Sequence, residues 1–209
     1  YMRRSIEKRA VRICFALSLI LASLLTMGMY RRVEAAEQSQ LQEHLAEEVL
    51  RFHVLANSDS TSDQELKIRV RDAVLAMMEE DMPETASVDE TKAWVRSHID
   101  EIEDVSRKTV ADAGEEYPVS AAVTTCWFPD RSYGDVTFPA GNYEALRIEI
   151  GAAQGHNWWC VLYPGLCFKD AANAVMPDES RKRLKNVLTE EEYSRITADT
   201  EFKIGWFFW

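Results

Sequence analysis

The hydrophobic pattern becomes regular at residues 51–56, where apolar and other side chains alternate. Phe52, Val54 and Ala56 occupy every second position, and this period of two is typical of a β-strand. The next four residues, Asn57-Ser58-Asp59-Ser60, bond readily to nearby backbone groups. We therefore expect a strand that ends in a polar turn.

A helical pattern follows this turn. Its apolar residues recur at steps of four and three, which places them on one helix face: Leu66, Val70, Val74 and Met77. Ser62 stands three residues before Glu65, which matches a capping box, so we expect Ser62 to cap the helix. Pro83 is expected to end it.

Further helices are predicted downstream. Ser87 and Glu90 repeat the capping pattern before a second amphipathic segment, which we expect to continue as one helix to about residue 114. Residues 182–193 have the pattern of another helix. Residues 202–209 are expected to form a final strand or an irregular aromatic tail.

Period-two segments return at residues 119–123, 146–150 and 157–163, with Gly151 and Gly155 around a turn before the last of them. One strand, two helices and then a meander of antiparallel strands is an α+β order. We therefore predict a single two-layer domain over residues 51–209, in which an antiparallel sheet packs against two or more helices.

The N-terminal region reads as a secretory segment. Basic residues precede an uncharged apolar run at residues 13–30, as in a signal peptide, although this length also fits a membrane anchor. We expect residues 1–35 to be a signal peptide or anchor, with cleavage between Ala35 and Ala36 favoured. Residues 36–50 would then form a polar helical lead-in to the domain.

The formal net charge of −11 changes the list of possible partners. A protein with this charge repels phosphate groups and anionic lipid headgroups, so binding to nucleic acid or to a membrane surface is disfavoured.

An exported domain would carry three cysteines, Cys126, Cys160 and Cys167, in an oxidising environment. If residues 162–165 form a four-residue loop, Cys160 and Cys167 become direct neighbours on paired strands and can form a disulfide. The alternative is two buried thiols that act as small apolar groups. If the bond forms, Cys126 is the one unpaired cysteine of the three.

Catalytic and metal sites are disfavoured by the residue pattern. A cysteine nucleophile could combine Cys160 with His53 or His156, but Cys160 lies in an apolar run that lacks an activating neighbour. Along one strand, His156 and Cys160 would be roughly 13 Å apart. Residues 57–68 fail as a calcium loop because Ser62 and Ile68 replace the required glycine and glutamate. Neither a metal nor another cofactor is therefore expected.

Three blocks of sequence resemble the stage II sporulation protein R family. They are residues 51–72, which begin Arg51-Phe52-His53-Val54; residues 138–143, Phe138-Pro139-Ala140-Gly141-Asn142-Tyr143; and residues 155–168, which contain His156-Asn157-Trp158-Trp159-Cys160. The resemblance implies a protein that is made in the forespore and exported into the intermembrane space of the sporulation septum. It also implies that the protein activates a membrane-bound aspartic protease, which matures the mother-cell sigma factor precursor. The implied role is a signal rather than an enzyme.

The same resemblance singles out candidate partner-binding residues: His53, Asn57, Asp59, Asp63, Lys67, Arg71, Tyr143, Asn157, Trp158 and Trp159. Of these, Lys67 and Arg71 are expected on the solvent side of their helix. Trp158 and Trp159 alternate along a strand, so we expect one in the core and one on the surface. The alternative functions are an exported cell-wall (peptidoglycan) hydrolase and a structural domain of the cell envelope.

Overall fold

The computed structural model describes residues 2–83, 87–165 and 177–198, with side chains from residue 12 onward. The chain divides into two units, residues 1–41 and residues 42–209. Helix α1 (Met2–Glu48) makes up all of the first unit that is described and continues into the second. Part of it, within Arg12–Glu48, is long and apolar enough to cross a membrane, a property that signal sequences share.

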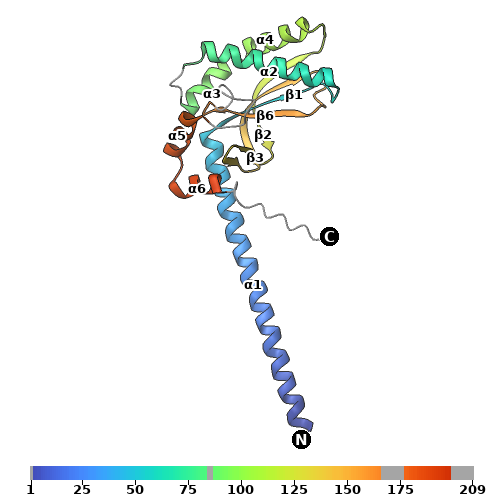
Figure 1. Cartoon of the computed structure of the whole chain (residues 1–209), viewed down its shortest axis with the longest axis vertical. Coiled ribbons are helices and arrows are strands. Elements are labelled where there is room, and N and C mark those ends of the chain that lie inside the picture. Colours follow the sequence, from blue (N-terminus) through green and yellow to red (C-terminus); the bar gives the residue numbers. More distant parts are fainter. Residues whose placement is uncertain (1, 84–86, 166–176, 199–209) are drawn as a thin grey trace. The chain divides into compact units, whose positions relative to one another are not determined.

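The second unit contains the remaining helices and strands (Figure 1). The helices are α2 (Thr61–Asp81), α3 (Val88–Ser97), α4 (Ile99–Asp112), α5 (Asp178–Val187) and α6 (Glu190–Ala198). The strands are β1 (Leu50–Leu55), β2 (Val119–Phe128), β3 (Arg131–Tyr133), β4 (Val136–Phe138), β5 (Gly141–Ile150) and β6 (Asn157–Tyr163).

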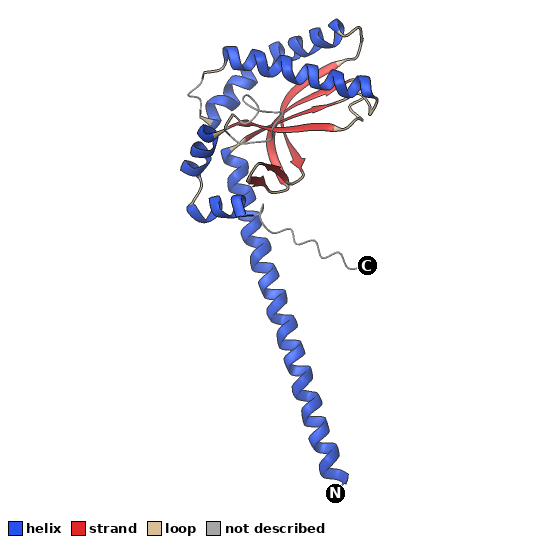
Figure 2. Cartoon of the chain, in the orientation of Figure 1, coloured by secondary structure: helices blue, strands red, loops and turns tan. Residues whose placement is uncertain are grey.

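The main sheet has four strands in the order β2-β5-β1-β6, and β3 pairs with β4 in a separate hairpin. Helices α2 and α4 pack together over one face of the main sheet (Figure 2). The predicted α+β class is therefore confirmed.

The sheet is mixed rather than wholly antiparallel, because β1 and β5 run parallel. The neighbouring pairs β1–β6 and β2–β5 are antiparallel. The chain passes through helices α2 to α4 and strands β2 to β4 between β1 and β5, and a long connection of this kind permits parallel pairing, which a short hairpin does not. β1 lies in the centre of the sheet, and all six of its residues are buried.

Two of the expected helices are each divided in two. The segment after Ser87 breaks at His98, whose ring stacks on Trp94 and whose Nδ1 lies 2.8 Å from the Trp94 carbonyl oxygen. The segment at residues 182–193 breaks at Thr189, which exchanges capping hydrogen bonds with Glu192 and so begins a new helix. The capping box of Ser87 and Glu90 is confirmed.

Helix α2 is capped by Ser60 rather than by Ser62. The Ser60 hydroxyl accepts a hydrogen bond from the Asp63 backbone N–H at 3.2 Å. Ser60 and Ser62 each stand three residues before an acidic residue, which is the spacing of a cap. The turn after β1 places Ser60 in the extended conformation that a cap requires.

We expect Ser60→Ala to lower the free energy of unfolding by about 1 kcal/mol, because an N–H in the first turn of α2 loses its acceptor. Ser62→Ala is the matched control, since Ser62 is exposed and lies inside the helix, and it should cost less than about 0.5 kcal/mol. Urea unfolding curves of both variants show which serine caps the helix. Equal losses, or a larger loss for Ser62→Ala, would contradict this assignment.

Candidate functional site

Most of the candidate residues from the first block gather where two turns meet. The turn after β1 (residues 56–60) and the turn between β5 and β6 (residues 151–156) are joined by backbone hydrogen bonds, and we call them the paired turns. The Gly155 N–H donates to the Ala56 carbonyl at 2.9 Å, and the Gln154 N–H donates to the Asn57 carbonyl at 3.3 Å. Residues about a hundred positions apart therefore form one surface.

Asp63 ties the first turn to helix α2. Its carboxylate accepts hydrogen bonds from Asn57 Nδ2 at 2.9 Å and from Ser58 Oγ at 2.5 Å. Asn57 Oδ1 in turn accepts from the Ala152 N–H in the second turn at 2.9 Å. The hydrogen bonds from Ser58 and Asn57 hold the pKa of Asp63 below its ordinary value. Asn57 and Asp63 thus have structural partners already.

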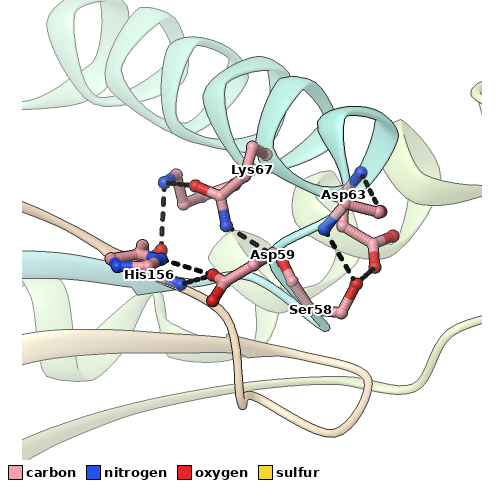
Figure 3. Close-up of polar contacts among 7 residues, drawn as sticks. Ser58, Asp59, Asp63, Lys67 and His156 are labelled. Carbon is pink, nitrogen blue, oxygen red and sulfur yellow. Dashed lines mark hydrogen bonds and ion pairs between the residues drawn. The ribbon is translucent and has the colours of Figure 1, made fainter.

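Asp59 and His156 form the exposed side of the paired turns (Figure 3). Asp59 Oδ1 accepts from the His156 backbone N–H at 2.6 Å and lies 2.5 Å from the His156 ring Nδ1. These contacts lower the pKa of Asp59. Because both side chains are more than half exposed, this pair is accessible to a partner.

Lys67 lies inside the fold, so the expectation that it faces solvent is wrong. Only 6% of the residue is exposed. Its Nζ donates to Gln64 Oε1 at 2.5 Å and to the His156 carbonyl at 3.0 Å (Figure 3), and burial lowers its pKa. The His156 carbonyl comes from the second turn, so Lys67 joins α2 to the paired turns.

We expect Lys67→Ala to lower the free energy of unfolding by about 1 to 3 kcal/mol, because it removes two hydrogen bonds from a charged donor. Lys67→Met is the matched control for lost packing, since it keeps an apolar stem of similar length without the ammonium group. The difference in unfolding free energy between Lys67→Met and Lys67→Ala measures how much of the lost stability comes from packing of the apolar stem. An unchanged melting temperature in Lys67→Ala would contradict the structural role.

Arg71 and Trp158 pack against each other instead of standing free. The Arg71 guanidinium lies 4.8 Å from the centre of the Trp158 ring and is paired with Asp72. The Trp158 ring also meets Phe52 edge-on at 5.5 Å. Only 14% of the Arg71 side chain is exposed. The expected solvent position of Arg71 is therefore wrong, although a role in partner binding stays a prediction.

The two tryptophans of β6 do not divide into core and surface. Trp158 and Trp159 are both partly buried, on opposite faces of the sheet. Trp159 stacks on His53 at 5.0 Å. Asn157, at the start of β6, is also partly buried.

Tyr143 is buried, with 1% exposed, and its hydroxyl donates to the Pro139 carbonyl at 2.7 Å. Burial raises its pKa to about 12. The Arg51 guanidinium lies 5.1 Å from the Tyr143 ring and 4.4 Å from the Phe128 ring, so the arginine is held by aromatic faces. The position of Tyr143 indicates a role in the core.

A cysteine–histidine contact, which the sequence did not predict, lies on the sheet face opposite α2. Cys126 Sγ in β2 is 3.4 Å from His53 Nε2 in β1. The two residues are 73 positions apart, and β5 runs between their strands. The period-two pattern of each strand was visible in the sequence, but the order of the strands was not.

This contact does not favour a nucleophile. Desolvation by burial lowers the pKa of His53 to about 4 and raises the pKa of Cys126, so both groups are neutral at pH 7. A catalytic cysteine needs thiolate character, and its histidine needs an orienting partner. His53 Nδ1 has no such partner in the part of the chain that the structure describes. Cys160 pairs in register with Phe52 rather than with His53 and is 4% exposed.

The predicted disulfide cannot be read from the fold, because Cys167 lies outside the described residues. Cys126 is a free thiol, as predicted. We expect alkylation of the exported protein, without reduction, to label Cys126 and to leave Cys160 and Cys167 unlabelled. Reduction should then lower stability by about 2 to 3 kcal/mol through the short loop. Labelling of both Cys160 and Cys167 would contradict the bond.

Groups of three or more potential metal ligands do not occur among the residues whose positions are described. The contacts around the paired turns are hydrogen bonds that join the two turns to each other and to α2.

Comparisons with known proteins identify a family. The family model for stage II sporulation protein R matches residues 46–173. The chain is similar to the stage II sporulation protein R of Bacillus subtilis (strain 168), with 33% identity over 195 residues, which cover 93% of this chain and 87% of that protein. No solved structure matches the chain.

Proposed function

Because the chain belongs to the stage II sporulation protein R family, we propose that it is an exported sporulation signal that activates a membrane-bound aspartic protease across the septum. The activated protease would then mature the precursor of the mother-cell sigma factor. The family match over most of the folded unit is the observation that carries this proposal.

The N-terminal helix supports the export step. It contains the apolar stretch that a signal peptide or a membrane anchor requires. Cleavage between Ala35 and Ala36 would release the folded unit into the intermembrane space, and an uncleaved helix would keep it attached to the membrane. Either form presents the domain outside the cytoplasm.

The chemistry of the domain supports binding rather than bond-making. The Cys126–His53 pair is neutral, and the candidate residues of the paired turns are engaged in hydrogen bonds that fix backbone geometry. A domain of this kind transmits a signal by presenting a rigid surface to a receptor.

The test is a binding assay between the purified folded unit and the extracytoplasmic part of the candidate protease. We expect saturable binding by the wild-type protein. A fragment of another exported protein of similar net charge serves as the control for non-specific attraction. Equal binding of the control, or none by the wild-type protein, would contradict the proposed receptor.

A further inference from the structure

Strand β2 forms one edge of the main sheet and lacks the usual protection of an edge strand. It is ten residues long, Val119–Phe128, and among the described strands it pairs only with β5. Its sequence, VSAAVTTCWF, contains no charged residue, no proline and no glycine. Edge strands of soluble proteins usually carry such residues, because unpaired backbone groups otherwise recruit another strand. β2 is therefore open to strand addition.

The direction of the backbone groups follows from two hydrogen bonds. The Pro118 carbonyl accepts from the Gly151 N–H and so points toward β5. The Ala121 N–H instead donates to Glu103 Oε2 in α4, at 3.2 Å, and so points away from β5. Alternate residues of a strand point their backbone groups the same way. The outward groups are thus those of Ala121 and of the next alternate residues: Val123, Thr125 and Trp127.

Beyond Ala121 these outward groups are available. Within the described residues, the N–H and carbonyl groups of Val123, Thr125 and Trp127 have no hydrogen-bond partner across the edge. Thr125 and Trp127 are exposed, and Val123 is partly exposed.

Trp127 provides an independent indication of a contact surface. It is 59% exposed, and the only other exposed large apolar residue among the described residues of the folded unit is Val187, at 38%. Exposed tryptophans on otherwise polar surfaces are favoured anchors of protein interfaces. The anchor and the open edge lie on the same strand.

We propose that the outer edge of β2 is the docking site for an extended segment of the receptor, which adds a fifth strand beside Val123, Thr125 and Trp127 and packs against the Trp127 ring. The proposal rests on the proposed function for the identity of the receptor. It does not rest on that function for the mode of binding, which is backbone pairing with a side-chain anchor.

Charge favours a receptor segment over a second copy of this chain. The net charge of −11 makes two copies repel each other. Glu116, an exposed acidic residue, precedes β2, whereas after β2 the exposed Asp130 is followed directly by the exposed Arg131. The segment that fits is neutral along the paired stretch and has a basic residue at the end that lies near Glu116.

Thr125→Pro tests the edge directly. It removes an N–H that points away from β5 and leaves the hydrogen bonds between β2 and β5 intact, a placement that proline tolerates in edge strands. Thr125→Val is the matched control, because it keeps the N–H and changes only the side chain. Trp127→Ala removes the anchor without changing the backbone, so it remains informative if the proline variant does not fold.

Each variant is measured in three ways: melting temperature, binding to the extracytoplasmic part of the protease, and spore yield. We expect Thr125→Pro to weaken binding at least about tenfold and Trp127→Ala to weaken it about thirtyfold, with matching losses of spores. Thr125→Val should bind and sporulate like the wild type, and all three should melt near the wild-type temperature.

Spore yield separates this inference from the proposed function. If the wild-type protein does not bind the protease, yet folded Thr125→Pro and Trp127→Ala still lose spores while Thr125→Val does not, the edge docks a different receptor and only the proposed protease is wrong. If both folded variants bind and sporulate like the wild type, docking at β2 is overturned and the proposed function stands.

Discussion

Acidification from pH 7 to pH 4 is expected to lower the free energy of unfolding by about 3 kcal/mol through His53 alone. His53 is 3% exposed, and burial beside Arg147 and Arg51 lowers its pKa from about 6.5 to about 4. Between these two values the unfolded chain binds a proton that the folded protein does not. Stability is therefore fully present above about pH 6.5 and is lost as the pH falls toward 4.

The measurement compares urea unfolding of the wild type and of His53→Phe at several values of pH between 7 and 4. Phenylalanine preserves a ring against Trp159 and Phe128 but cannot bind a proton. Carboxylates add their own acid dependence in both proteins, so the difference between the two curves isolates His53. Parallel curves would show that His53 titrates normally and would contradict its burial as a neutral ring.

Gly155→Ala is expected to lower the free energy of unfolding by about 3 kcal/mol, because the paired turns leave no room for a side chain there. A Cβ at this position would overlap the backbone carbonyl group of Ser58 in the other turn and would lie 2.9 Å from Gln64 Nε2. A flexible side chain can move aside, but a backbone carbonyl in a hydrogen-bonded turn cannot.

Gln154→Ala is the matched control for this turn, since the neighbouring Gln154 is exposed and should cost less than about 0.5 kcal/mol. Hydrogen exchange of the Ala152 and His156 amides gives a second readout, because both donate to side chains of the first turn. Gly155→Ala should speed their exchange. A variant with wild-type stability and unchanged exchange would mean that the two turns are not held together as described.

Local patterns in the sequence predicted local structure well. The alternation of Phe52 and Val54 predicted β1, and Ser87 with Glu90 predicted the start of α3. These predictions succeed because strand period and helix capping depend on residues a few positions apart. The errors at Ser60 and Thr189 also concern nearby residues. Ser60 and Ser62 match the capping pattern equally well, and a cap at Thr189 inside residues 182–193 is compatible with the helical pattern on either side of it.

Features that depend on distant residues were not predictable in this way. The parallel pairing of β1 with β5, the burial of Lys67 under the His156 carbonyl, and the Cys126–His53 contact each need the strand order. A lysine next to an apolar helix face ordinarily reaches solvent, and only a carbonyl supplied by a remote turn makes its burial favourable. The exposed tryptophan was missed likewise, because which strand becomes an edge is a property of the whole sheet.

Processing of the sigma factor precursor by the candidate protease in reconstituted membranes tests directly whether this chain is the activating signal. The purified folded unit is added from the extracytoplasmic side, and cleavage of the precursor is followed on the other side. We expect wild-type protein and Thr125→Val to raise cleavage well above its basal rate, whereas folded Thr125→Pro should leave it at the basal rate. Cleavage that proceeds at the same rate with and without the wild-type protein would contradict the claim that this chain is the activating signal.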